Sequence, residues 1–519
     1  MEPETDLLVV GAGPTGLTLA IQARIMGAAV RVVERRNSPR NWAPALAVHP
    51  RTMEILRGLG VADQLMRRSA TEVELEVHVD GSTIGGRLFD LRLPATDYPF
   101  ILFSPQPEVE SVLRERLLAL GVDVEWGREL TDLDDHDGYV ECQLRAPNGR
   151  GESIITRFVA GCDGAESSVR RLVRIPFLGR DYRQSILVAD AEPTAALSPG
   201  TAHAFLRGEG ILFIFPLPSG RWRLIAPKTA GDELDLADLV ARHTQGKVTL
   251  SRTGWVTAIR PQHRLARRYR RGRVFLAGDA AHVHSPAGAQ GMNTGIQDAA
   301  NLGWKLALAA RGAPDALLDT YEKERRRVAK QVVRLTGLAF ALEVSDSWVF
   351  KMGRRWAAHP VASLLLPRPR LVSFVARVVS GLDTHYRDGA VGRGSGCRRH
   401  FGPGSRLPDR ALSGGWPESR LHQLTDASGF HLLIFDDVVD EEVLGSLSHR
   451  WGGSVGVGHV SGSRARSPRP PSYVLVRPDG YIAARGGDHS LSRAVEYLDE
   501  WVGPVGFGGS SARHRPAPT

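Results

Sequence analysis

A glycine-rich turn between an apolar strand and a helix constrains the fold of this chain more than any other feature. The apolar run at residues 6–10 ends at Gly11, and residues 14–26 then repeat apolar side chains at helical spacing. A second β-branched run, residues 29–33, ends at Glu34. Strand, turn, helix and strand within about 30 residues form a βαβ unit, whose two strands lie parallel in a buried sheet. We therefore expect an α/β fold.

The same turn has the GxGxxG spacing of a dinucleotide-binding site, with Gly11, Gly13 and Gly16 as its glycines. Glycines let the backbone approach a pyrophosphate, the helix N-terminus favours negative charge, and Glu34 can accept hydrogen bonds from a ribose. A chain with 56 glycines produces this pattern readily by chance, so its position between strand and helix carries the prediction. The alternative is a tight turn in an ordinary α/β core.

Two further segments end a strand-like run in a short acidic turn. In residues 273–297 a buried strand ends at Gly278 and Asp279, and a loop of small residues leads into a helix that starts near Met292. Asp279 can accept hydrogen bonds from ligand hydroxyls, and the amides of Met292 and Asn293 would stabilise negative charge on a bound ring system. Residues 159–170 repeat the arrangement, with Asp163 and Gly164 in the turn.

The middle of the chain has the pattern of a different sheet. Residues 73–79 alternate apolar and polar side chains, which is typical of a strand covered on one face. More strand-like runs follow between residues 186 and 255 before the chain returns to the buried strand at residue 274. We expect a half-exposed antiparallel sheet inserted into the parallel one. Phe213, Phe215 and Trp222 in this sheet are candidates for an apolar wall against an aromatic substrate, with ordinary core packing as the alternative.

The last third of the chain predicts a small separate domain. Residues 381–404 are rich in Gly, Arg and His and have the composition of a linker. Strand-like runs at residues 431–435 and 473–476 and a helical pattern at residues 490–502 follow. Residues 461–472 and the tail after Gly503 are expected to be loop or disordered.

Composition and charge exclude several function classes. The net charge of +9 comes mostly from arginine, and the densest basic run, residues 264–273, contains one aromatic residue, so we predict a solvated face and no nucleic-acid binding. Cys142, Cys162 and Cys397 show no metal-ligand spacing, which indicates a reducing compartment and no metal site. The acidic N-terminus and the absence of a long apolar run predict a cytoplasmic protein without a membrane span.

Taken together, the three motifs in this order and spacing resemble the single-component FAD-dependent aromatic hydroxylases, the group that includes p-hydroxybenzoate hydroxylase. The resemblance covers residues 5–345. The rest is similar to the longer members, phenol hydroxylase and the aromatic polyketide hydroxylases, which end in a thioredoxin-like domain; residues 476–485 match that domain's ending. This part of the chain lacks CxxC, so we expect no redox module.

The resemblance implies a discontinuous arrangement of domains. A Rossmann-like α/β FAD-binding domain would comprise residues 1–72, 100–180 and 262–345. The inserted antiparallel substrate domain would comprise residues 73–99 and 181–261. A helical region and linker at residues 346–400, a thioredoxin-like α/β domain at residues 401–503 and a disordered tail at residues 504–519 would complete the chain.

The resemblance also assigns roles to individual residues. Gly11, Gly13 and Gly16 would hold the FAD pyrophosphate, Glu34 and Arg35 the adenosine end, and Asp279 the ribityl chain. Gly291, Met292 and Asn293 would contact the pyrimidine edge of the flavin, Gln106 would touch FAD, and Asp163 would serve both FAD and NADPH. Pro286 would lie beside the isoalloxazine. His49, His282 and His284 lie near the motifs and are therefore candidates for a base that deprotonates the phenol. No catalytic base is assigned, and His282 is expected to be a packed or hydrogen-bonded residue.

Two positions depart from the pattern of the relatives. Many have a basic residue immediately before Ala45, where this chain has Pro44, so the positioning or motion of the flavin is expected to differ. Many also have an arginine or histidine where this chain has Glu166, and Arg170 or Arg171 would then meet the NADPH phosphate.

The activity that the resemblance implies is hydroxylation of a bulky, polyketide-type phenol. NADPH or NADH would reduce FAD, O2 would add at flavin C4a, and the hydroperoxide would deliver OH to the ring. The alternatives are Baeyer-Villiger or antibiotic-inactivating oxygenation by the same flavin, and a non-catalytic FAD-binding redox sensor. We expect a monomer or a homodimer.

Overall fold

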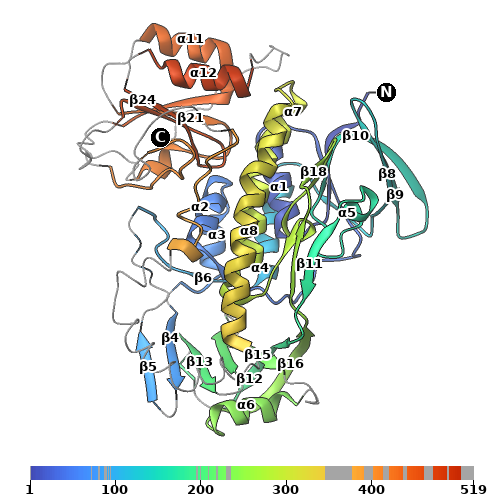
Figure 1. Cartoon of the computed structure of the whole chain (residues 1–519), viewed down its shortest axis with the longest axis vertical. Coiled ribbons are helices and arrows are strands. Elements are labelled where there is room, and N and C mark those ends of the chain that lie inside the picture. The colour runs from blue at the N-terminus through green and yellow to red at the C-terminus, as the bar shows by residue number, and fades with distance from the viewer. Residues whose placement is uncertain are drawn as a thin grey trace.

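The computed structural model describes residues 2–344, 377–390, 401–435, 441–460 and 471–503. Short gaps within these ranges fall at residues 72, 80–81, 87–90, 92, 94, 195–196, 199, 208–209, 218–219, 229–234, 413–419 and 488–489. The predictions for residues 346–376, 391–400, 461–470 and 504–519 lie outside the described residues. Figure 1 shows the long helix α8 (Ala316–Val344) running beside the sheets, with the C-terminal α/β domain at one end of the molecule and a second large sheet at the other.

The first sheet contains the predicted parallel strands. Its order is β18-β19-β10-β1-β2-β7, and β19, β10, β1, β2 and β7 all run parallel. The strands are β1 (Thr5–Val10), β2 (Val30–Glu34), β7 (Val124–Trp126), β8 (Glu129–Asp135), β9 (Val140–Arg145), β10 (Gly151–Gly161), β18 (Arg270–Arg271) and β19 (Val274–Leu276). The central strands are buried on both faces, which explains their continuous apolar runs.

Helices cover this sheet and connect its strands. They are α1 (Pro14–Ile25), α2 (Pro50–Gly58), α3 (Ala62–Arg67), α4 (Gln106–Ala119), α5 (Ser168–Leu172), α7 (Gln290–Ala310) and α8. The crossing of α1 and α7 brings Gly303 against the side chain of Gln22, where an added Cβ would lie 2.8 Å from it. Small strands β3 (Ala47–Val48), β6 (Leu102–Phe103), β11 (Phe177–Asp181), β17 (Gln262–Ala266) and β20 (His282–Val283) link the parts.

The second large sheet has the order β16-β12-β15-β14-β13-β4-β5. Its strands are β4 (Glu74–Val79), β5 (Ser82–Gly86), β12 (Ser185–Pro193), β13 (Thr201–Arg207), β14 (Gly210–Pro216), β15 (Trp222–Lys228) and β16 (Leu250–Ile259). The expectation of a purely antiparallel sheet is corrected at one pair, because β4 and β13 run parallel. These strands are separated by more than 100 residues, so no short hairpin dictates their direction.

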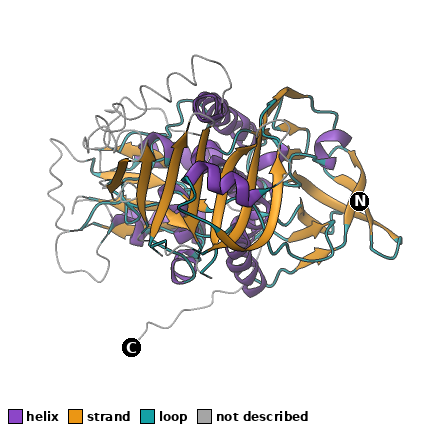
Figure 2. Cartoon of the chain, turned by 90° about the horizontal axis from the view of Figure 1, so that it is seen from below, coloured by secondary structure: helices purple, strands orange, loops and turns teal. Residues whose placement is uncertain are grey.

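The two faces of this second sheet have different neighbours. The outer face packs Leu212, Ile214 and Leu224 against helix α6 (Leu236–Thr244). Figure 2 looks onto this face, with α6 crossing the strands. On the inner face, Phe215 joins a cluster with Leu46 and Phe103 of the first domain. The sheet therefore presents one side to α6 and the other to the domain that contains the three motifs.

The C-terminal domain is a small α/β unit. Its sheet has the order β22-β21-β23-β24, with β21 and β22 parallel and the remaining pairs antiparallel. The elements are β21 (Phe430–Ile434), α11 (Glu441–Trp451), β22 (Val455–His459), β23 (Tyr473–Val476), β24 (Ile482–Gly486) and α12 (Ser492–Trp501). Within the described ranges, no helix combines the length and the apolar composition that crossing a membrane requires.

Candidate cofactor and substrate site

The three motifs meet at one edge of the first sheet. Parallel strands end at a common edge, and the turns after β1, β10 and β19 all lie there. The contacts are close: a Cβ added at Gly11 would lie 2.4 Å from the carbonyl oxygen of Cys162, and one at Gly278 would lie 2.5 Å from Oγ1 of Thr15. The φ angles of these glycines are +106° and +60°, in the left-handed region that favours glycine. The turns therefore pack directly against one another.

The N-terminus of α1 is shaped to accept an anion. A Cβ added at Gly13 would meet nothing within 4 Å, so open space adjoins the backbone there. Pro14 occupies the first position of the helix, and the first amides of any helix lack intrahelical partners. Gly16 is needed for packing, because its Cβ would lie 1.9 Å from the carbonyl oxygen of Gly11. This arrangement fits a pyrophosphate on the helix N-terminus.

Glu34 lies at the end of β2 and is held in place by its neighbours. Its carboxylate accepts hydrogen bonds from the Ala12 amide (2.9 Å) and from the Arg36 side chain (3.0 and 3.2 Å). Burial alone would raise the pKa of Glu34, but these bonds lower it below its ordinary value, so the group is ionised. Arg35 is exposed, and Gln106 begins α4 and donates to Glu110 at 2.8 Å.

Two aspartates of the candidate site have unused hydrogen-bonding capacity. One oxygen of Asp163 accepts the amides of Ser168 (2.7 Å) and Val169 (3.2 Å), while Oδ1 is buried and has no partner among the described residues. Asp279 is exposed to solvent at the same sheet edge, yet desolvation by the surrounding protein raises its pKa. Burial also raises the pKa of Asp163. Both carboxyl groups suit a ligand that brings hydroxyl donors.

The loop before α7 presents a second helix N-terminus to the same space. Gly288 (φ 72°) and Ala289 (φ 52°) are both left-handed and turn the chain into the helix; glycine adopts this conformation freely, whereas Ala289 is strained. Gly291 and Met292 are half-buried in the first turn, and Pro286 is exposed. The Asn293 side chain is committed to protein, since it donates to Ala47 and Ala289 and accepts the His49 amide at 2.8 Å.

The histidines near the motifs are mostly buried. Burial lowers the pKa of His49 to about 4, so its ring is neutral at pH 7, and its Nε2 is buried without a hydrogen-bond partner in the described part of the chain. The pKa of His284 is also lowered to about 4 by burial. His282 is fully buried and bonded to Asp298 at 2.7 Å, as expected for a packed residue.

Sequence reasoning missed the residues that hold the Gly278 turn. Asp298 on α7 accepts hydrogen bonds from the Gly278 amide (3.2 Å), from His282 and from Arg325 (2.7 Å), and all four residues are buried. Arg170 supports the same turn by donating to the Ala280 carbonyl at 2.9 Å. Arg170 is therefore engaged in structure, whereas Arg171 is exposed.

The inner face of the second sheet carries two of the three predicted aromatic residues. Phe213 and Phe215 are half-buried and stacked, with ring centroids 5.8 Å apart. The expectation for Trp222 is corrected: it packs in the outer-face cluster beside α6, because side chains alternate along β15. Its neighbour Arg223 points inward instead, bonding Asp190 and the backbone carbonyls of residues 43 and 44.

These features together fit FAD. The open backbone at Gly13 fits the pyrophosphate, the buried and unpartnered Oδ1 of Asp163 and the solvent-exposed carboxyl group of Asp279 fit sugar and ribityl hydroxyls, and the α7 N-terminus fits an electron-rich ring edge. The residues that would hold the group come from three strand ends and one helix, which is the convergence that the motifs predict.

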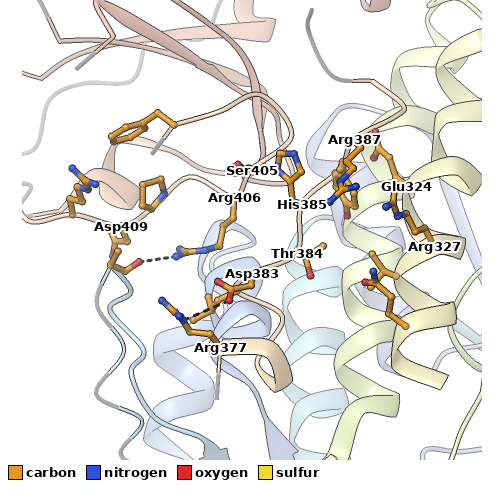
Figure 3. A pocket seen from close by; sticks show the side chains of 18 of the residues that line it. Glu324, Arg327, Arg377, Asp383, Thr384, His385, Arg387, Ser405, Arg406 and Asp409 are labelled. Atoms are coloured by element: carbon orange, nitrogen blue, oxygen red, sulfur yellow. Dashed lines mark hydrogen bonds and ion pairs between the residues drawn. The ribbon is translucent and has the colours of Figure 1, made fainter. Parts of the chain in front are cut away.

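A separate cavity of about 930 Å³ lies away from these motifs, between α8, residues 377–390 and the C-terminal domain. Figure 3 shows its charged lining, which includes Glu324, Arg327 and Arg406. None of the three motifs contributes to it, so we do not assign it to the cofactor.

Comparison with known proteins gives two matches to protein families. Residues 4–336 match a family described as FAD binding domain, and residues 400–505 match one described as aromatic-ring hydroxylase, C-terminal. The chain is 37% identical to 6-methylpretetramide 4-monooxygenase of Streptomyces rimosus, across 100% of this chain and 98% of that protein. It is 32% identical to pentachlorophenol 4-monooxygenase of Sphingobium chlorophenolicum, across 96% and 90%.

Solved structures agree with these matches. OxyS anhydrotetracycline hydroxylase from Streptomyces rimosus superposes with a TM-score of 0.78 at 29% identity, covering 97% of this chain and 100% of that one. CabE, an aromatic hydroxylase from angucycline biosynthesis, superposes with a TM-score of 0.77 at 30% identity, covering 96% and 99%. The similarity therefore extends over all the domains of this chain.

Proposed function

Because this chain belongs to the FAD-dependent aromatic-ring hydroxylases and is an FAD-dependent monooxygenase, we propose that it hydroxylates a polycyclic phenol of the polyketide type, with NADPH as the reductant. Substrate, O2, NADPH and a proton would give the hydroxylated product, water and NADP⁺. Relatives named for pretetramide and anhydrotetracycline support the substrate class. Because the named relatives are monooxygenases, the comparisons favour an enzyme over the alternative of a non-catalytic redox sensor.

One structural observation carries the substrate proposal, namely the stacked aromatic surface on the inner face of the second sheet. Phe215 lies between Phe213 and Phe103, with centroid distances of 5.8 and 5.5 Å. The same face packs Ile186 and Val188 against Ala287, which lies beside Pro286 in the loop before α7. A flat, multi-ring substrate would stack on these rings next to the proposed flavin position.

The chain's own residues would bind, orient and shield the reactants. When bound, FAD supplies the electron transfer that allows O2 to be used for hydroxylation. Gly11, Gly13 and Gly16 would hold its pyrophosphate, Glu34 and Arg35 the adenosine end, and Asp279 the ribityl hydroxyls. The amides of Gly291 and Met292 would stabilise negative charge at the flavin edge, because the first amides of α7 have no intrahelical partner. The aromatic face would exclude water.

The substrate class is tested by anaerobic reduction of the FAD-bound enzyme with NADPH. We expect a four-ring phenol to accelerate flavin bleaching more than a one-ring phenol does, and aerobic turnover to give a product with one added hydroxyl by NMR. A Phe213→Ala variant should lose the preference for the larger phenol while it keeps its flavin. Equal stimulation by both phenols would contradict the proposed substrate class. If NMR showed an oxygen atom inserted into a ring of the product, the reaction would be Baeyer-Villiger oxygenation and not hydroxylation.

A further inference from the structure

A cluster of three metal-ligand side chains lies on the outer face of the second sheet, away from the proposed flavin site. Glu76 and His78 are two residues apart on β4, so both project to the same face. His203 on β13 is the direct cross-strand partner of Glu76. Leu75 and Ala202 belong to the inner-face cluster instead. The parallel pairing of β4 and β13 therefore assembles the group from two distant segments.

The three potential ligand atoms have the mutual spacing of a tetrahedral site. His78 Nε2 lies 3.2 Å from His203 Nδ1, and Glu76 Oε2 lies 3.4 Å from His203 Nδ1 and 3.7 Å from His78 Nε2. Zinc bonds of about 2.0–2.2 Å to nitrogen and oxygen in a tetrahedron separate neighbouring ligands by roughly 3.3–3.5 Å. A cation slightly out of the plane of this triangle would reach all three atoms and keep a fourth position for water.

The surroundings fix both imidazole rings in this orientation. Thr83 on β5 lies 3.1 Å from His78 Nδ1, and a hydroxyl that accepts that N–H leaves the Nε2 lone pair directed into the cluster. The His78 ring stacks on Phe205 with centroids 4.3 Å apart. His203 Nε2 is buried away from any hydrogen-bond partner among the described residues, so Nδ1 is the nitrogen that faces the cluster.

The three side chains differ in exposure: His203 is buried, His78 is largely covered, and the carboxylate is the ligand open to solvent. Glu76 is half-exposed and supplies the anionic ligand and an entry path from solvent.

We propose that Glu76, His78 and His203 form a binding site for a divalent cation of the zinc class. The nitrogen-rich ligand set favours Zn²⁺ over Mg²⁺ or Ca²⁺, which prefer oxygen ligands. The bound ion ties β4 to β13, the one parallel pair of this sheet, whose opposite face belongs to the inner-face cluster. It therefore stabilises the sheet that carries the aromatic surface.

The test measures zinc binding to the full chain with FAD bound and without a histidine tag. After treatment with chelator, the protein is equilibrated with micromolar Zn²⁺ and its metal content is determined by mass spectrometry. We expect one equivalent per chain, a higher melting temperature with Zn²⁺, and, with Co²⁺ instead, an absorption typical of tetrahedral cobalt beyond the flavin bands.

Three variants separate the site from other histidines. Glu76→Gln removes a half-exposed ligand and should abolish binding at micromolar Zn²⁺. Thr83→Val leaves the ligands intact and should weaken binding by about tenfold to a hundredfold, since it removes the partner that orients His78. His136→Gln alters an exposed histidine in the turn between β8 and β9 and should bind like the wild type. Binding by the wild type at millimolar Zn²⁺ only, or equal binding by Glu76→Gln, would overturn the proposal.

Discussion

Replacement of Glu324 by glutamine should loosen the attachment of the C-terminal domain. Glu324 on α8 accepts two hydrogen bonds from Arg477 of that domain (both 2.9 Å) and one from Lys305 on α7 (2.9 Å). Asp479 also pairs with Arg477. All four side chains are buried, so two cations and two anions balance inside the protein. Glu324→Gln leaves this cluster with one uncompensated positive charge.

The size of the effect follows from the ionisation of Glu324. Burial alone would raise its pKa, but Arg477 and Lys305 lower it from an ordinary value of 4.5 to about 2. At about 1.4 kcal/mol per pH unit, this difference corresponds to roughly 3 kcal/mol of stability. Removing one partner of a buried ion pair costs about 3–5 kcal/mol, which agrees. At about 2.1 cal/mol/K of unfolding entropy per residue, a chain of 519 residues loses roughly 1 °C per kcal/mol, so we expect the midpoint of thermal unfolding at pH 7 to fall by roughly 3–5 °C.

The assay is thermal unfolding followed by circular dichroism, with Glu115→Gln as the control. Glu115 bonds Arg68 at the surface, where water screens the pair, so its loss should change the midpoint little. Because the pKa of Glu324 is depressed in the folded state, its contribution is fully present above pH 4.5 and is lost as the pH falls towards 2. The difference in unfolding midpoint between the wild type and Glu324→Gln should thus stay constant from pH 7 to 5 and become smaller below pH 4.5. Equal midpoints for Glu324→Gln and Glu115→Gln at pH 7 would refute this reasoning.

Four further substitutions test the cofactor and substrate assignments. Asp279→Ala should lose flavin during purification, and flavin content measured by absorbance after gel filtration decides this; full retention with unchanged turnover would contradict the role of Asp279. Gly278→Ala should also lower flavin content, because the added Cβ would lie 2.5 Å from Thr15 at a φ of +60°; circular dichroism checks its folding. Phe213→Ala should raise KM for a polycyclic phenol, whereas Trp222→Phe should change only the melting temperature, since Trp222 packs beside α6. If Trp222→Phe raised KM more than Phe213→Ala did, the substrate would bind on the outer face of the second sheet and not on the inner face.

The sequence allowed the fold to be predicted where local pattern and backbone geometry coincide. Gly11 and Gly278 have left-handed φ angles and lie at the ends of buried parallel strands, so their residue type follows from local conformation. The parallel sheet could be predicted from its continuous apolar runs. For the same reason the positions of Asp163 and Asp279 at one sheet edge could be anticipated.

Contacts between distant segments could not be predicted in this way. Asp298 has no motif of its own, yet it joins the Gly278 turn to His282 and Arg325. The group formed by Glu76 and His203 depends on a parallel strand pair that no hairpin dictates. The alternation around residue 76 showed which side chains share a face, but only the pairing with β13 supplied the third ligand. The prediction of no metal site rested on the spacing of the three cysteines, and that spacing cannot reveal a site built from histidine and glutamate side chains.

The position of Arg223 bears on the unusual Pro44. The resemblance leads one to expect a basic side chain at position 44, and the structure places a basic side chain against it from another domain. Arg223 on β15 donates to the carbonyl oxygens of Ala43 (2.8 Å) and Pro44 (3.0 Å) while it bonds Asp190 at 3.1 Å. Because Arg223 is buried and paired, the loop is tied to the inner face of the second sheet. The positive charge near this loop thus comes from the second sheet, and any movement of the loop has to break two hydrogen bonds to that sheet.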